Sequence, residues 1–334
     1  MKKKYFILFL LLNLFYIYSL DYNTKIVVFC YHRFGFKNHP FSVLENVLKE
    51  HINLARKNGF SIISEKDLFD FYYNEKSLKP KCFLITVDDC YIDSYKILFS
   101  VLKEEKISGL YFLNTNTVDK KKYISWENIK EMKKEEIFFG SHSKSHFNYY
   151  KLRKDKDFES LLESEIKNSF DIINKNIKDT ILSYAHPYGI YNPTVMDDIK
   201  NSDYKLVFTT TKAPNIYETD PLYLNRYVIT KYDTTADIEE FLDYELLPIK
   251  KTIPENGDFL KRDKKIYFIF SNTKEIARFR NFNFEIDNKK YEANVYKNTV
   301  WFDCRKIKRK SFDISLKCTD KFNNKYIYSI LINI

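Results

Sequence analysis

The stretch Cys82-Phe83-Leu84-Ile85-Thr86-Val87-Asp88-Asp89 joins a nearly continuous apolar run to two carboxylates. A run of this kind is typical of a strand that is buried on both faces of a parallel sheet. Both carboxylates would then emerge at the carboxyl end of the strand, where (β/α) barrels build their active sites. The stretch therefore predicts a fold class and the place of a functional site.

A second motif, Ser141-His142-Ser143-Lys144-Ser145-His146, supplies two imidazoles four residues apart. One carboxylate and two imidazoles make a three-ligand set for a catalytic metal, whose fourth position stays open for water. The spare carboxylate of the Asp pair can act as a base on that water. Solvated turns, helix caps and structural His pairs offer a simpler explanation of each motif alone. Three of the chain's six His lie in short motifs after apolar runs, which favours the metal site.

The order of apolar and helical patterns predicts two structural units. Repeated β-then-α units over residues 21–250 predict a parallel sheet of the α/β class, and their number favours a distorted (β/α) barrel of about seven strands. Within it, Ser42-Val43-Leu44-Glu45 has the form of a capping box, which predicts that a helix begins there. Over residues 256–334 the short β-type runs leave no room for helices and predict a small antiparallel β-sandwich.

The first 20 residues have the pattern of a signal peptide or an N-terminal membrane anchor. Met1-Lys2-Lys3-Lys4 is a basic start, and the apolar run from Tyr5 to Leu20 is short for a spanning helix. We therefore expect an exported chain that is periplasmic, extracellular or anchored at the outer face of the membrane.

Two cysteines of the C-terminal unit could form a disulfide. Cys304 and Cys318 lie on neighbouring β-type segments, and an oxidising compartment would allow them to pair. The alternative is that both thiols stay reduced.

The basic charge of the chain is concentrated near its end. The net charge is +10, and residues 256–334 hold 18 Lys and Arg against 9 Asp and Glu, a surplus of +9. Arg305-Lys306-Ile307-Lys308-Arg309-Lys310 is the densest run. Nucleic acid does not suit an exported chain, so an anionic envelope polymer or membrane surface is the expected partner. A merely solvated basic face is the alternative.

Three motifs resemble those of the polysaccharide deacetylases, metal-dependent carbohydrate esterases that remove N-acetyl groups from sugar polymers. Thr86-Val87-Asp88-Asp89-Cys90 is similar to the first motif of that family, Thr-Phe-Asp-Asp-Gly. The His pair motif is similar to the second, Ser-His-Thr-x-x-His. Tyr184-Ala185-His186-Pro187-Tyr188-Gly189 resembles the third in its Pro-Tyr-Gly part. The resemblance covers about residues 25–230.

Three further stretches resemble the branch of that family that acts on poly-N-acetylglucosamine in biofilms. They are Tyr31-His32 after the first strand, Ser125-Trp126-Glu127, and Leu224-Asn225-Arg226. In that branch the general-acid His comes early in the chain, so the resemblance implies that His32 is the acid. It also implies that Arg226 orients Asp88. Tyr31, Trp126 and Pro187, which lie in these motifs, are candidates for substrate binding. His186 has no named role in the family, and we expect it to be either a fourth substrate-binding residue or a structural one.

One position departs from the family pattern. Cys90 stands where the first motif of the family has glycine. If that turn needs a positive φ, the side chain costs about 1 kcal/mol or more. The sulfur could also lie near the metal as a thiolate.

The resemblance implies hydrolysis of N-acetyl groups in N-acetylglucosamine polymers, with release of acetate. Asp89, His142 and His146 would hold a divalent metal, expected to be Zn²⁺, with Co²⁺ or Ni²⁺ as alternatives. Asp88 would be the base, His32 the acid, and the backbone N–H of Tyr188 would stabilise the oxyanion. Two alternatives stay open: a catalytically impaired carbohydrate-binding protein on the same fold, and a deacetylase that acts on O-acetyl esters.

Overall fold

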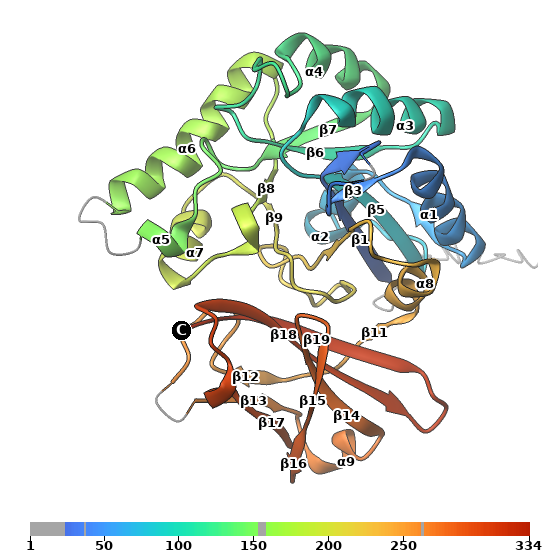
Figure 1. Cartoon of the computed structure of the whole chain (residues 1–334), viewed down its shortest axis with the longest axis vertical. Helices are drawn as coiled ribbons and strands as arrows, with labels where there is room; N and C mark the ends of the chain where they lie inside the picture. The colour runs from blue at the N-terminus through green and yellow to red at the C-terminus, as the bar shows by residue number, and fades with distance from the viewer. Residues whose placement is uncertain (1–23, 37, 153–157, 262–263) are drawn as a thin grey trace, which may run out of the picture.

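The computed structural model describes residues 24–36, 38–152, 158–261 and 264–334, and shows a barrel packed against a two-sheet module (Figure 1). The predicted signal or anchor segment, residues 1–20, lies outside the described residues. Within the described ranges, no helix has both the length and the apolar character that a membrane crossing needs.

Seven parallel strands curl into a half-barrel. They are β1 (Lys25–Tyr31), β5 (Lys81–Val87), β6 (Gly109–Leu113), β7 (Ile137–Ser141), β8 (Ser183–Ala185), β9 (Leu206–Phe208) and β10 (Tyr227–Val228). Their order is β10-β1-β5-β6-β7-β8-β9, and the short β4 (Ser61–Ile62) also pairs with β5. The predicted α/β class and the distorted barrel of about seven strands are confirmed.

Helices cover the outer side of the strands (Figure 1). They are α1 (Glu45–Lys57), α2 (Glu65–Tyr73), the π-helix η1 (Ser94–Phe99), α3 (Ser100–Glu105), α4 (Trp126–Met132), the short turn η2 (Lys133–Glu135), α5 (Tyr149–Leu152), α6 (Phe158–Ile177), α7 (Pro193–Lys200) and α8 (Thr235–Asp243). The helix α1 shows why these segments pack as they do. It buries Leu48, Ile52 and Ala55, whose spacing of three and four residues forms one apolar face.

The predicted capping box at Ser42 is wrong. Ser42 and Val43 form the strand β3, which pairs with β2 (Arg33–Phe34). The helix α1 begins at Glu45, and the residue before it, Leu44, makes no side-chain cap hydrogen bond. The pairing of β2 with β3 therefore overrides the local capping preference.

The two-residue period of the strands decides to which side of the sheet the Asp88 side chain points. Successive side chains of a strand face opposite sides of the sheet. In β1, Phe29 packs in the core under the helices, whereas Val28 packs in the core that the strands enclose. In β5, Leu84 belongs to that enclosed core. Asp88 is an even number of residues after Leu84 and therefore points to the same side of the sheet. Its buried carboxylate faces the barrel interior at the carboxyl end of the strand.

The C-terminal unit is a sandwich of two mainly antiparallel sheets. The first holds β11 (Glu245–Leu246), β14 (Phe279–Ile286), β15 (Lys289–Glu292), β18 (Ser311–Asp320) and β19 (Lys325–Asn333); the second holds β12 (Lys251–Ile253), β13 (Lys265–Ile269), β16 (Asn294–Tyr296) and β17 (Thr299–Asp303). Alternate residues of β13 and β17 enter a shared core. The predicted sandwich is confirmed. The expectation that it has no helices is wrong, because α9 (Thr273–Ile276) lies within it.

Of the two alternatives for Cys304 and Cys318, the structure has the reduced thiols. All five cysteines lie in the described residues, and none of them is in a disulfide. Cys304 follows β17 in one sheet, whereas Cys318 lies in β18 of the other. The two positions are therefore not neighbours across one sheet, as the prediction required.

The sandwich packs against loops that follow the barrel strands at their carboxyl ends. Tyr150, after β7, donates its hydroxyl to Ile334 O at 3.0 Å. Asn333 Nδ2 donates to the backbone oxygen of Tyr191, after β8, at 2.9 Å. Leu331 of β19 packs in the same core as the barrel helices. The sandwich thus borders the end of the barrel that carries the Asp pair and the His pair.

Candidate metal centre and active site

The three predicted metal ligands lie together. Asp89 follows β5, and His142 and His146 follow β7; their potential ligand atoms lie within 4.8 Å of one another. Asp89 Oδ1 is 3.2 Å from His146 Nε2 and 3.8 Å from His142 Nε2. The structure therefore places one carboxylate and two imidazoles around a single point, as the motif spacing predicts.

His142 is prepared to act as a neutral ligand. Its Nδ1 lies 2.8 Å from the backbone oxygen of Ala185. A carbonyl oxygen only accepts, so Nδ1 carries the proton and the lone pair of Nε2 points toward Asp89. Burial lowers the pKa of His142 to about 4, although the nearby charge of Asp88 opposes this. The ring is therefore neutral near pH 7, and this donor set fits Zn²⁺.

Asp88 is held by Arg226 in a buried two-pronged ion pair. Arg226 Nη1 is 2.7 Å from Asp88 Oδ1, and Nη2 is 2.8 Å from Oδ2. Burial alone would raise the pKa of Asp88, but Arg226 and His142 together hold it well below its usual range. Arg226 Nε in turn donates to Thr209 O at 2.9 Å, which fixes the guanidinium. Asp88 is therefore ionised and fixed in one orientation, as a proton acceptor requires.

Cys30, at the end of β1, also contacts the proposed base. Its Sγ donates to Asp88 Oδ2 at 3.3 Å, and burial raises the pKa of the thiol well above its usual range. Cys30, His32 and Asp88 form a second group with atoms within 4.8 Å. A metal needs a thiolate, but here the thiol is protonated and Arg226 occupies both oxygens of Asp88. The Asp89–His142–His146 group is therefore the better metal centre.

His32 lies beside Asp88 at the end of β1. Its ring centroid is 5.2 Å from that of Phe41. Its Nδ1 is buried and has no hydrogen-bond partner among the described residues. Burial lowers the pKa of His32, while the charges of Asp88 and Asp89 oppose this. The imidazole thus adjoins both carboxylates without being one of the three clustered ligands.

The third motif places Tyr188 next to the metal ligands. Tyr188 lies in the short turn η3 (Pro187–Gly189), and its ring centroid is 4.4 Å from that of His146. The side chain is 58% exposed, so it borders the opening of the site. Gly189 has φ +67°, and a Cβ there would lie 1.8 Å from Thr210 Oγ1. Only glycine fits that position, which keeps the turn close to the chain after β9.

Several site residues adopt left-handed backbone conformations. The non-glycine residues with positive φ in the three motifs are Asp89 (64°), Cys90 (50°), Ser143 (60°), His146 (58°) and Tyr188 (59°). Such conformations cost about 1 kcal/mol or more each and concentrate at functional sites. Each motif is therefore a strained turn that the surrounding fold maintains.

Cys90, which stands where the family has glycine, does have a positive φ. Its side chain therefore carries the backbone cost that glycine would avoid. The thiol points away from the imidazoles, because Sγ donates to Phe112 O at 3.1 Å. Burial, with Asp88 and Asp89 nearby, raises the pKa of this thiol well above its usual range. Cys90 is thus a neutral, hydrogen-bonded thiol and lies outside the candidate metal groups of the described residues.

The four predicted substrate-binding residues differ in exposure. Tyr31 and His186 are both 0% exposed, and Pro187 is buried as well. The Tyr31 hydroxyl lies 3.1 Å from His51 Nδ1, and the His186 ring stacks on Tyr191. The structure therefore puts Tyr31 and His186 in the core, which favours the structural role for His186. Trp126 is partly buried at the start of α4.

Glu165 supports the second motif, although nothing in the sequence distinguishes it within a charged helix. Its carboxylate accepts from Ser145 N at 2.8 Å and from Ser145 Oγ at 2.7 Å. Its backbone oxygen accepts from Lys144 N at 3.1 Å. Glu165 lies on α6 and is 8% exposed. It therefore fixes the loop between the two His ligands.

Known proteins share both the motifs and the fold. The sequence model of the polysaccharide deacetylase family matches residues 75–207, which include Asp88, Asp89 and both His ligands. This part of the barrel therefore matches the polysaccharide deacetylase family. His32 and Arg226 lie outside the matched range.

Two curated proteins are similar to part of this chain. Over 187 residues it is 26% identical to the putative polysaccharide deacetylase YxkH of Bacillus subtilis, covering 56% of this chain and 65% of that protein. Over 200 residues it is 24% identical to a poly-beta-1,6-N-acetyl-D-glucosamine N-deacetylase of Staphylococcus aureus, covering 57% and 68%. The chain therefore covers slightly less than two thirds of the length of the first relative and slightly more than two thirds of the second.

Two solved structures share the fold of the barrel. The Streptococcus pyogenes deacetylase PplD, in complex with acetate, has a TM-score of 0.60 at 21% identity and covers 66% of this chain and 98% of its own. IcaB from Ammonifex degensii has a TM-score of 0.59 at 23% identity and covers 66% and 97%.

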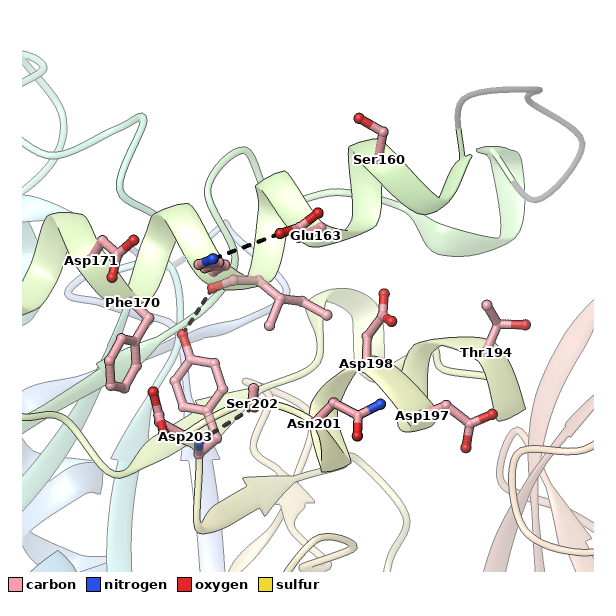
Figure 2. A pocket seen from close by; sticks show the side chains of 13 residues that line it. Ser160, Glu163, Phe170, Asp171, Thr194, Asp197, Asp198, Asn201, Ser202 and Asp203 are labelled. Carbon is pink, nitrogen blue, oxygen red and sulfur yellow. Dashed lines mark hydrogen bonds and ion pairs between the residues drawn. The ribbon is translucent and has the colours of Figure 1, made fainter.

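A hollow of the barrel lies elsewhere, between α6 and α7 (Figure 2). Its volume is about 900 Å³, and five carboxylates line it, those of Glu163, Asp171, Asp197, Asp198 and Asp203. It contains none of the predicted site residues and no imidazole. Carboxylates alone do not supply the mixed nitrogen and oxygen donors of the Asp–His group. The Asp89–His142–His146 group is therefore the better candidate for a metal site.

Removing Arg226 will strongly destabilise the barrel. In Arg226→Met the Asp88 charge stays buried without its partner, and losing one member of such a pair costs roughly 3–5 kcal/mol. The matched control is Arg309→Met, because Arg309 pairs with Asp287 at 2.8 Å but is 60% exposed. Exposed pairs contribute about 0–1 kcal/mol. Urea unfolding should show the larger loss for Arg226→Met, and equal losses would contradict the buried pair.

Acid will weaken the same ion pair. The pKa of Asp88 is lowered in the folded chain, so the stabilisation is fully present above the unfolded pKa of about 4 and is lost as pH falls below it. Urea unfolding at a series of pH values should therefore show a smaller penalty for Arg226→Met as the pH decreases.

Proposed function

We propose that this protein is a metal-dependent N-deacetylase that removes N-acetyl groups from N-acetylglucosamine polymers and releases acetate. The observation that carries the proposal is the buried Asp88–Arg226 pair beside the Asp89–His142–His146 group. An ionised base next to a three-ligand metal group is what hydrolysis of an amide by water requires. The proposed substrate rests on the similarity to the poly-beta-1,6-N-acetyl-D-glucosamine N-deacetylase of Staphylococcus aureus.

The proposed mechanism assigns each proton to a residue. Asp89, His142 and His146 would hold a divalent metal, for which we propose Zn²⁺, and the metal would supply Lewis-acid activation of water and carbonyl. Asp88 accepts a proton from the attacking water. The backbone N–H of Tyr188 donates to the carbonyl oxygen as it gains negative charge. His32 protonates the nitrogen of the departing amine, so the C–N bond breaks to acetate and a glucosamine unit.

Two alternative functions give different results in one assay. A catalytically impaired carbohydrate-binding protein on the same fold would bind oligomers without releasing acetate. A deacetylase of O-acetyl esters would release acetate faster from O-acetyl than from N-acetyl sugars. We expect acetate from N-acetylated β-1,6 or β-1,4 oligomers at the higher rate. The panel should include both linkages, peptidoglycan and an O-acetylated glycan.

His32→Ala should cut kcat while leaving the metal content unchanged. General-acid catalysis contributes about 10²–10⁴-fold, so a decrease of this size is expected. His186→Ala is the matched control, because His186 is also an imidazole at a strand end but is buried against Tyr191. Steady-state rates and metal analysis of both variants test the assignment. A larger decrease of kcat in His186→Ala would show that the general acid was assigned to the wrong histidine.

We also propose that the enzyme is exported and that its basic sandwich binds an anionic envelope polymer or membrane surface. The support is the charge of this unit, where Lys308, Arg309 and Lys310 are exposed. Leu331 of the sandwich packs in the barrel core, so deleting the unit would disturb the barrel. Charge removal is therefore a cleaner test than truncation.

Replacing Lys308, Arg309 and Lys310 with Gln should weaken binding to isolated cell envelope. Binding of the unchanged chain should fall as salt rises, because exposed charges are screened over about 10 Å at 0.1 M salt. The matched control replaces the exposed run Lys120, Lys121 and Lys122 of the barrel with Gln. A co-sedimentation assay measures both. Equal binding by all three proteins would mean that the basic run does not bind the envelope and is only a solvated face.

A further inference from the structure

A polar groove separates the barrel from the sandwich on the side of α8. Its volume is about 610 Å³. One wall comes from α8 and from Thr230, Tyr232 and Asp233, which follow β10 at its carboxyl end. The other wall comes from β14, β15, β18 and β19 of the sandwich, and includes Asn281 and Asn283. Two units of the chain thus form this groove together.

The groove begins next to the proposed acid. Tyr232 follows Lys231, whose backbone N–H donates to Pro40 O at 2.9 Å. Phe41 is the next residue after Pro40, and its ring centroid lies 5.2 Å from that of His32. Because β10 pairs with β1 in parallel, the segment that carries Tyr232 lies at the same end of the barrel as His32.

The groove is also tied to the residue that holds the base. Lys212 lines it and contacts Asn288 Oδ1 of the sandwich at 3.1 Å. The preceding residue, Thr211, accepts from the backbone N–H of Arg226 at 3.1 Å. Sequence neighbours of two lining residues thus contact the segment beside His32 and the backbone of Arg226.

The lining suits an uncharged sugar chain. Four Lys and four Asp or Glu line the groove, so it carries no net charge in a chain of net charge +10. A balanced lining favours neither a polyanion nor a polycation. Tyr232 is 69% exposed and offers a flat amphipathic ring, and Asn283 Oδ1 is buried without a partner among the described residues. Rings and amides are the groups that contact the apolar faces and the hydroxyl or amide groups of sugars.

We propose that this groove binds the N-acetylated sugar units that neighbour the unit being deacetylated. The proposal rests on the proposed function and adds to it a subsite that the sandwich helps to build. A longer oligomer would then bind more tightly than a short one, because only the longer chain extends from the metal centre past Tyr232. The chemical step itself would not change, since none of the groove residues contacts the reacting groups.

The test uses the full chain with Tyr232→Ala and, separately, Asn283→Ala. For a hexamer of N-acetylglucosamine, KM should rise roughly fivefold in each, as expected for the loss of one contact of about 1 kcal/mol. The value of kcat for the hexamer, and KM for the dimer, should not change. The control is Tyr296→Ala, since Tyr296 is 67% exposed on β16 and does not line the groove. It should behave as the wild type.

Calorimetric binding of the hexamer gives a second readout that needs no turnover. The affinity should fall by the same factor in Tyr232→Ala and stay unchanged in Tyr296→Ala. Unchanged hexamer KM and affinity in both groove variants, or an equal effect on the dimer, would overturn the subsite. If the wild type releases no acetate from any oligomer, the proposed function fails, and the calorimetry alone still decides whether the groove binds sugar.

Discussion

Asp88→Asn will lower kcat by roughly 10²–10⁴-fold, the usual contribution of a general base, while the protein keeps its metal. Asn has nearly the same shape but cannot accept the proton of the attacking water. The ligands Asp89, His142 and His146 are unchanged, so metal content should match the wild type. Rate and metal analysis on the same sample separate these two effects.

Stability must be measured alongside the rate, because Arg226 loses a buried partner in this variant. The fraction folded, from urea unfolding, corrects the rate for any unfolded protein. Asp303→Asn is the control: Asp303 pairs with the 74%-exposed Arg305, far along the chain in the sandwich, and its loss should leave kcat unchanged. A near-normal kcat in folded, metal-loaded Asp88→Asn would remove Asp88 from the role of base.

His142→Ala will lose both the metal and the activity. The change deletes one of the three ligands. The ring of this ligand, His142, is fixed by its hydrogen bond to the Ala185 carbonyl. Removing even an outer partner of a metal ligand typically costs 10–100-fold in affinity, so removing a ligand itself should cost more. Zinc content after dialysis, measured with acetate release, tests this expectation.

His51→Ala is the matched control for His142→Ala. His51 is also a buried imidazole, but it contacts Tyr31 on the outer side of β1. Its removal should reduce stability and leave zinc content and kcat per folded molecule unchanged. If both variants retained zinc equally, the Asp89–His142–His146 group would not be the metal centre.

The parts of the site that sequence predicted are those carried by single strand ends. Asp88 and Asp89 directly follow an apolar strand, and His142 follows another. Parallel strands bring such ends to one edge, so the ligand set could be expected from spacing alone. The barrel class was predictable for the same reason, since each β-then-α unit is a local pattern.

The parts that sequence missed depend on contacts between distant segments. Arg226 meets Asp88 across 138 residues, and only the family resemblance pointed to it. Cys30 and Glu165 contact site residues through the packing of β1 and α6, and neither belongs to a recognisable motif. The capping box at Ser42 failed because pairing with β2 took its place. The groove beside Tyr232 exists only because the sandwich packs against α8.

The most direct test of the central claim is acetate release from an N-acetylglucosamine oligomer by the full chain, with and without metal. Protein stripped by a chelator should release none, and adding Zn²⁺ should restore release, because the Asp–His group is then filled. Asp88→Asn with the same zinc content should stay inactive. Release at the full rate by metal-free protein, or no release by zinc-loaded wild type, would contradict the account.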